Sequence, residues 1–192
     1  MGLLSSIFGR KKPAVAPEDG LFALATAQVD LEMRHGLVPS GKAGVCFRVM
    51  SSSFFGELER ELQGLLAAGE RTAGTRHKVV DDDYGFRWVI LADDDFEDLV
   101  TAAYIVTQAF GEHGYRDQLL AAVFPFRQDG RDVQWIYGYR RGRFYPFVPI
   151  PGAQRRDNPL ELSLSAKAAG SLPMEDQVER WYALWGAPFH VL

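Results

Sequence analysis

The sequence is poor in residues that commonly carry covalent or metal chemistry. Cys46 is its single cysteine among 192 residues, which excludes an intramolecular disulfide and a cysteine-based zinc cluster. Its four histidines are scattered at positions 35, 77, 113 and 190, without an H-E-x-x-H or G-x-S-x-G pattern. Cys46 lies in an apolar strand pattern, so we interpret it as a buried small hydrophobe rather than a nucleophile.

The sequence also lacks long apolar runs and an excess of positive charge. No run approaches the roughly 20 apolar residues that span a bilayer. Lys and Arg number 21 against 25 Asp and Glu, and the formal net charge of -4 argues against nucleic acid binding by the whole protein. The hydrophobic fraction of 47% and charged fraction of 24% are those of an ordinary globular chain, long enough to fold without a metal or disulfide.

An apolar and basic segment, residues 1–12, opens the chain. Its large apolar residues recur with the spacing of one face of a short helix: Leu3, Leu4, Ile7 and Phe8. Three cations follow, where they complement the helix dipole: Arg10, Lys11 and Lys12. Because the charges come after the apolar residues, the segment does not resemble a secretory signal.

This N-terminal segment predicts a contact with an anionic membrane surface or with a groove on a partner protein. Packing against its own domain and disorder remain as alternatives. Four apolar side chains give only weak, reversible membrane affinity by themselves. Residues 13–20 are predicted to form a linker, and residues 21–192 a single domain.

The hydrophobic pattern of the body predicts an α+β fold, a mostly antiparallel sheet packed by two to three helices. The predicted strands span residues 28–34, 43–50, 86–92, 119–126, 133–139, 144–148 and 160–164. The predicted helices span residues 54–69, 96–111 and about 174–184. Such an order of strands and helices favours α+β over a doubly wound α/β fold.

Two turns define the best-marked part of this sheet. Asp129-Gly130 is a strong signal for a two-residue hairpin, and Arg141-Gly142 marks a second turn. Together they predict a three-strand antiparallel meander. In the last predicted helix we interpret Trp181, Tyr182 and Trp185 as core residues, because large aromatic side chains dominate core burial.

Two patterns suggest ligand sites but have simpler interpretations. Residues 36–43 match most of a phosphate-binding loop, yet Ala43 replaces its Ser/Thr hydroxyl and a predicted strand, not a helix, follows. The acidic runs at 81–83 and 93–95 lack the ligand spacing of a calcium loop. We interpret the first run as a turn and the second as a helix cap, and we predict neither a metal ion nor a cofactor.

An arginine cluster is the leading candidate for a binding site. Arg140, Arg141 and Arg143 gather at a hairpin tip among aromatic residues, and Arg155 and Arg156 follow the next break. Arginines in such surroundings bind phosphates, single-stranded nucleic acid, lipid head groups or an acidic partner helix. The alternative is a solvated hairpin tip whose aromatic side chains pack the sheet.

Six stretches, taken in their order along the chain, resemble the PspA-associated protein PspAB family. They are the opening Met-Gly-Leu-Leu…Phe-Gly-Arg of residues 1–10, then residues 44–48, 84–88, 143–147, 157–162 and 180–188. The resemblance implies a link to phage-shock protein A, a peripheral coat protein that protects stressed membranes. It implies no catalytic residues, and none are assigned.

We therefore expect a cytoplasmic, non-enzymatic accessory protein of a membrane-stress system, working at or near the inner face of the membrane. Its expected partner is a PspA-type coat protein, with weak membrane contact and no nucleic acid; the oligomeric state stays open. One alternative is a peptide-binding, chaperone-like module, motivated by the aromatic meander. Another is an enzyme or sensor for a small anionic ligand, which requires the arginine cluster and the acidic runs to share one pocket.

Overall fold

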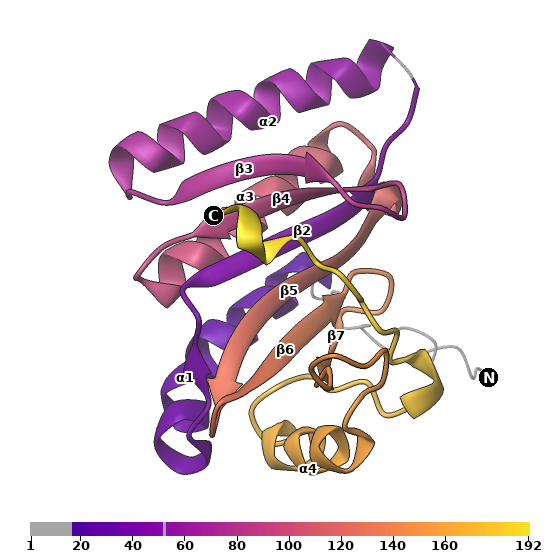
Figure 1. Ribbon diagram of the computed structural model, residues 1–192. Helices are drawn as coiled ribbons and strands as arrows, with labels where there is room; N and C mark the ends of the chain where they lie inside the picture. The colour runs from indigo at the N-terminus through magenta and orange to yellow at the C-terminus, as the bar shows by residue number, and fades with distance from the viewer. Residues whose placement is uncertain (1–16, 52) are drawn as a thin grey trace, which may run out of the picture.

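The computed structural model describes residues 17–51 and 53–192 as a seven-stranded antiparallel sheet with four α-helices (Figure 1). This architecture confirms the predicted α+β fold. The N-terminal segment, residues 1–12, and the first part of the linker lie outside the described residues.

All pairs of neighbouring strands are antiparallel. The strands are β1 (Val38–Pro39), β2 (Lys42–Arg48), β3 (Arg76–Asp81), β4 (Phe86–Ala92), β5 (Leu119–Gln128), β6 (Arg131–Gly138) and β7 (Arg143–Phe147). Their order across the sheet is β3-β4-β2-β5-β6-β7, and β1 pairs with the far end of β5. The predicted meander is confirmed as β5-β6-β7, and Asp129 and Gly130 form its first turn with φ of 50° and 75°.

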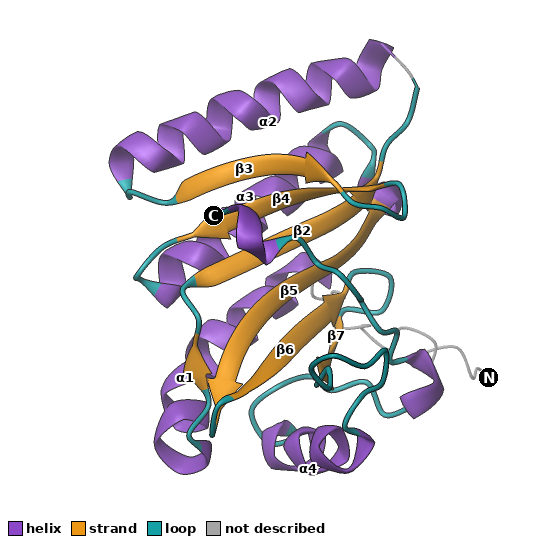
Figure 2. Ribbon diagram, in the orientation of Figure 1, coloured by secondary structure: helices purple, strands orange, loops and turns teal. Residues whose placement is uncertain are grey.

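The helices are α1 (Phe22–His35), α2 (Ser53–Thr72), α3 (Phe96–Glu112) and α4 (Asn158–Ala168), with short 3-10 turns at Pro17–Leu21, Arg116–Gln118, Val178–Arg180 and Phe189–Val191. All four helices contribute to one hydrophobic core with the sheet: α1 and α3 lie behind it, α2 lies beside β3 and α4 beside β7 (Figure 2). The second acidic run caps α3 as predicted, because the Asp95 side chain accepts from the backbone N–H groups of Glu97 and Asp98.

Strand alternation builds two hydrophobic cores on the two faces of the sheet. On β2, Val45 and Phe47 join the large core beneath the helices, whereas Cys46 joins the smaller core on the opposite face. The chain after Arg180 crosses this second face and covers it (Figure 1). Lys42 of β2 holds this C-terminal segment in place, because its Nζ donates to the main-chain oxygens of Phe189 and Leu192, at 2.7 and 2.5 Å.

Three predicted elements were wrong. The strand predicted at 28–34 belongs to α1, whose buried residues Leu24, Ala27 and Leu31 follow a helical period. The strand predicted at 160–164 belongs to α4, which Asp157 caps by accepting from the Leu160 N–H. The helix predicted at about 174–184 is an irregular segment with one 3-10 turn, in which Trp181 packs into the second core. Tyr182, which was predicted to be a core residue, is 69% exposed.

Candidate functional site

The arginine hairpin and the segment after α4 enclose a polar hollow of about 310 Å³. It is lined by Arg140, Arg141, Arg143, Met174, Glu175, Asp176, Gln177 and Arg180. The two parts are held together by a short bridge beside β7, where the Phe144 N–H donates to Pro173 O and Phe144 O accepts from the Glu175 N–H. Four guanidinium groups against two carboxylates leave this pocket with an excess of two positive charges.

Glu175 is the buried acidic residue of the pocket and pairs with two of its arginines. Only 7% of the residue is exposed. Its carboxylate accepts from the Gln177 N–H at 3.1 Å and lies 3.6 Å from Arg141 Nε and 3.5 Å from Arg180 Nη1. Because a buried carboxylate needs such partners, Glu175 holds two arginines in place at the pocket wall.

The two remaining arginines differ in how they are held. Arg143 donates to Met174 O at 3.3 Å, which fixes it to the opposite wall. Arg140 is exposed, and within residues 17–51 and 53–192 its side chain makes no hydrogen bond or ion pair. Its guanidinium therefore keeps its full bidentate donor capacity for an external anion.

The other two arginines of the predicted binding set do not line the pocket. Arg156 donates to both carboxylate oxygens of buried Glu161 and to Trp181 O, and its guanidinium lies 5.3 Å from the centre of the Phe147 ring. These contacts join the loop before α4 to the C-terminal segment. Arg155 is exposed on the same loop.

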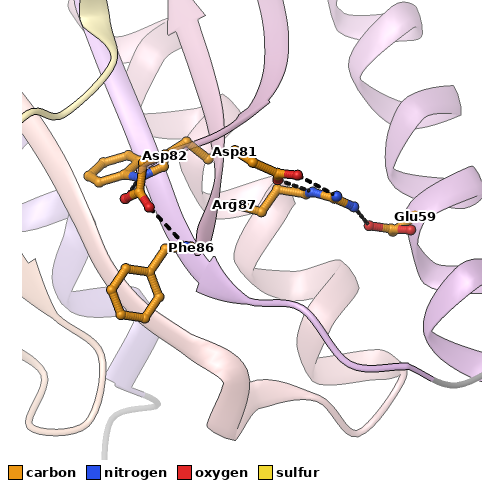
Figure 3. A network of polar contacts seen from close by, with 6 residues as sticks. Glu59, Asp81, Asp82, Phe86 and Arg87 are labelled. Carbon is orange, nitrogen blue, oxygen red and sulfur yellow. Dashed lines mark hydrogen bonds and ion pairs between the residues drawn. The ribbon is translucent and has the colours of Figure 1, made fainter. Parts of the chain in front are cut away.

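The first acidic run lies at the β3–β4 turn, at the opposite end of the sheet from the arginine hairpin. Asp81 receives a bidentate contact from Arg87, at 2.6 and 2.9 Å, and Arg87 also contacts Glu59 of α2 (Figure 3). This pairing lowers the pKa of Asp81 and raises that of Arg87.

Asp82 shapes the turn itself. Its side chain accepts from the Tyr84 and Phe86 N–H groups, both at 2.9 Å, and from Trp88 Nε1 at 2.8 Å. The acidic runs therefore serve the turn and the α3 cap, and they do not share a pocket with the arginines. Among the described residues, no group of three or more His, Cys, Asp or Glu side chains is placed to hold a metal ion.

Two further features of the described part of the chain concern the reactivity of Cys46 and the length and polarity of the helices. Burial, and to a smaller degree the charge of Asp82, raises the pKa of the Cys46 thiol to about 12, so thiolate is scarce at neutral pH. None of the helices in residues 17–51 and 53–192 is both long and apolar enough to cross a bilayer.

The sequence pattern missed the five pocket residues that follow α4, and the charged ones that pair with each other or with the hairpin are Glu175 and Arg180. Both belong to the stretch for which a helix was predicted, so their convergence on the hairpin had no local signal. From sequence alone, a segment rich in Glu and Arg is expected to be a solvated surface. Only the parallel bridge between Phe144 and Met174 shows that this segment lies beside β7 and the arginine hairpin.

Comparison with known proteins gives a family but no closer relative. Neither the search of curated proteins nor the search of solved structures gave a match. The family described as PspA associated protein B matches residues 1–189, which is nearly the whole chain. With this match, the chain belongs to the PspA-associated protein B family, as the order of its sequence stretches had indicated.

Proposed function

We propose that this protein is a non-enzymatic accessory protein of the PspA membrane-stress response, and that its arginine pocket binds acidic side chains of a PspA-type coat protein. The family supports an association with PspA. The observation that carries the proposal is the pocket itself, with its excess of two positive charges and an exposed Arg140 that makes no ion pair among the described residues.

The pocket suits carboxylates presented by a protein surface. Its lining is almost entirely polar or charged, with Met174 as the one apolar side chain. Planar guanidinium groups bind carboxylates through two parallel hydrogen bonds, which gives orientation as well as attraction. Glu175 already shows how the wall arginines Arg141 and Arg180 pair with a carboxylate, and a partner's carboxylate would bind in the same way at Arg140.

The enzyme or sensor alternative loses part of its basis, because it required the acidic runs to join the arginines. Asp81 and Asp82 are instead engaged at the β3–β4 turn. The peptide-binding alternative keeps one structural support, since β3 pairs only with β4 among the described residues and is an open sheet edge.

The second half of the proposal concerns the N-terminal segment, residues 1–12. Its apolar face and its three cations suit a weak, reversible contact with an anionic membrane. A PspA-type coat lies on such a membrane, so the pocket and the segment would act on the same assembly from two points.

Direct binding between the purified chain and a purified PspA-type coat protein tests the pocket. Arg140→Glu should weaken binding at least about tenfold, corresponding to about 1.4 kcal/mol, because it places a like charge opposite the partner's carboxylates. Lys167→Glu makes the same charge change on an exposed face of α4 and should leave binding unchanged. Equal affinity of the Arg140→Glu variant and the unaltered chain would contradict the proposal.

A further inference from the structure

The two edges of the sheet are treated differently in this fold. The β7 edge is closed by the bridge between Phe144 and Met174. The β3 edge has β4 as its single partner among the described residues. Most natural proteins cover or distort an exposed edge, because its free N–H and C=O groups pair readily with another strand.

The hydrogen-bond register shows which groups of β3 are free. The Asp82 N–H donates to Phe86 O at 2.8 Å, so this residue pair is hydrogen-bonded. In an antiparallel ladder such pairs alternate with pairs that are not hydrogen-bonded. Counting back along the register, Lys78 and Val80 bond to β4, and the backbone groups of His77, Val79 and Asp81 point away from it.

The pairing between β4 and β2 leads to the same assignment. The Asp93 N–H donates to Gly41 O at 3.1 Å, which makes the odd-numbered residues of β4 the ones that bond to β2. The even-numbered residues of β4 are therefore left for β3, opposite Lys78 and Val80.

The charges along this edge are segregated by sign. Arg76, His77 and Lys78 form its first half, and Asp81 is followed by Asp82 and Asp83 at its end. Arg76, Lys78 and Asp83 are exposed and make no ion pair within the described part of the chain. Mixed or single-sign charges on an edge repel a second strand, but this arrangement becomes complementary when a second copy runs antiparallel.

We propose that β3 is a self-association edge, through which two copies of this chain pair their β3 strands antiparallel about a two-fold axis at Val79. In this register Val79 faces Val79 of the partner copy and His77 faces Asp81, so all the outward backbone groups of the three residues are paired. Arg76 lies opposite Asp82 of the partner copy. Lys78 is the diagonal neighbour of the same Asp82, and long side chains can span the distance between diagonal neighbours.

The proposed pairing joins two sheets into one and keeps both helix layers on the same side. α2 lies along β3 (Figure 1), and Glu70 of this helix contacts His77 at 3.2 Å. The two-fold axis therefore brings the two α2 helices next to each other across the junction. The arginine pocket, at the far edge of each sheet, stays open in this dimer.

The oligomeric state of the full chain, measured by light scattering over concentrations from about 1 to 100 µM, tests the proposal. The unaltered chain should approach twice its 21.5 kDa mass. Val79→Pro should stay monomeric, because it removes an N–H that faces away from β4 and leaves the β3–β4 ladder intact. Arg76→Glu with Lys78→Glu should weaken the dimer at least about tenfold by making both halves of the edge acidic.

Arg127→Glu with Lys167→Glu is the matched control, since it makes the same charge change at exposed sites elsewhere and should leave the dimer intact. Amide hydrogen exchange gives an independent readout. The amides of His77, Val79 and Asp81 should become protected only at high concentration, and those of Lys78 and Val80 at every concentration.

A chain that stays monomeric to about 100 µM overturns the proposal. A dimer that neither Val79→Pro nor Arg76→Glu with Lys78→Glu weakens also overturns it. The same holds for a dimer that the control, Arg127→Glu with Lys167→Glu, weakens as much as the edge variants do. The charge pair keeps the test decisive if the proline variant fails to fold, and circular dichroism identifies that failure. An open edge that pairs with extended peptides but not with itself would favour the peptide-binding alternative.

Discussion

Glu161 shows how one buried side chain fixes the region beside the pocket. It is 1% exposed, and it accepts from the Val148 N–H at 2.8 Å and from Arg156 Nε at 2.8 and 3.0 Å. Burial raises the pKa of its carboxyl, and the hydrogen bonds from Arg156 and Val148 partly oppose the rise. The residue thus joins β7, its following loop and α4 at a cost in desolvation that only its partners offset.

Glu161→Gln keeps the shape and the acceptor for Val148 but leaves Arg156 without a counter-charge. We expect a loss of about 2 kcal/mol in the free energy of unfolding at neutral pH, measured by urea denaturation. Glu179→Gln, on the exposed surface, is the control and should change little.

The pH dependence of that difference has a definite sign. A folded-state pKa raised above the unfolded value means that ionised Glu161 costs stability at higher pH, and that this cost is relieved as the pH falls through the folded pKa. The Gln variant has no titrating group at this position, so acidification through this pKa stabilises only the unaltered chain. The stability difference between the two proteins should therefore widen on acidification, and a difference that shrank would contradict this interpretation of Glu161.

At the scale of elements, the C-terminal segment packs on the second face of the sheet as the helices pack on the first. It covers the second face of the sheet with side chains from an irregular chain section, held by Lys42 and by Arg156. Gly44 of β2 lies directly beneath it, since an added Cβ there would come within 3.1 Å of the Phe189 ring. Close packing of this kind depends on the absence of a side chain on β2.

The N-terminal segment is the element on which the membrane half of the proposal depends. Flotation of the full-length chain with vesicles rich in anionic lipid should recover the protein, and Ile7→Asp with Phe8→Asp should abolish recovery by removing apolar area. Vesicles of neutral lipid are the control and should bind less, because Arg10, Lys11 and Lys12 then lose their attraction. Equal recovery of both proteins, or of neither on anionic vesicles, would contradict a membrane contact.

At the scale of the whole molecule, two cores share one sheet. Cys46 lies on β2 between β4 and β5, with its thiol in the second core, so solvent reaches it only when the C-terminal segment detaches or the sheet opens. A shared sheet couples the helix layer to the C-terminal segment. We predict that residues 21–192 unfold as one cooperative unit.

Thiol labelling measures this directly. With a pKa of about 12, roughly one native Cys46 thiol in 10,000 is ionised at pH 8, so labelling should be negligible until the chain unfolds. The urea midpoint of labelling should coincide with that of tryptophan fluorescence. Labelling well before the fluorescence change would show that the C-terminal segment detaches from the sheet and that the domain is not a single unit.

Local sequence signals predicted the elements whose stability is mainly local. The Asp129-Gly130 turn needs φ above zero at both residues, and Asp95 caps α3 through bonds to residues two and three positions ahead. α1 and α4 were misread as strands because their short apolar patterns fit either period. Only their packing against the sheet distinguishes the two.

The sequence by itself determined the α+β class, the meander, the capping role of Asp95 and the membership of a family. It also placed three arginines at one hairpin tip. Tertiary structure alone decided that Glu175 and Arg180 join those arginines, that Arg156 turns away to Glu161, and that β3 ends as an open edge. The reason is physical: turns and caps depend on bonds between neighbours in the chain, whereas a pocket or an edge exists only where distant segments meet or fail to meet.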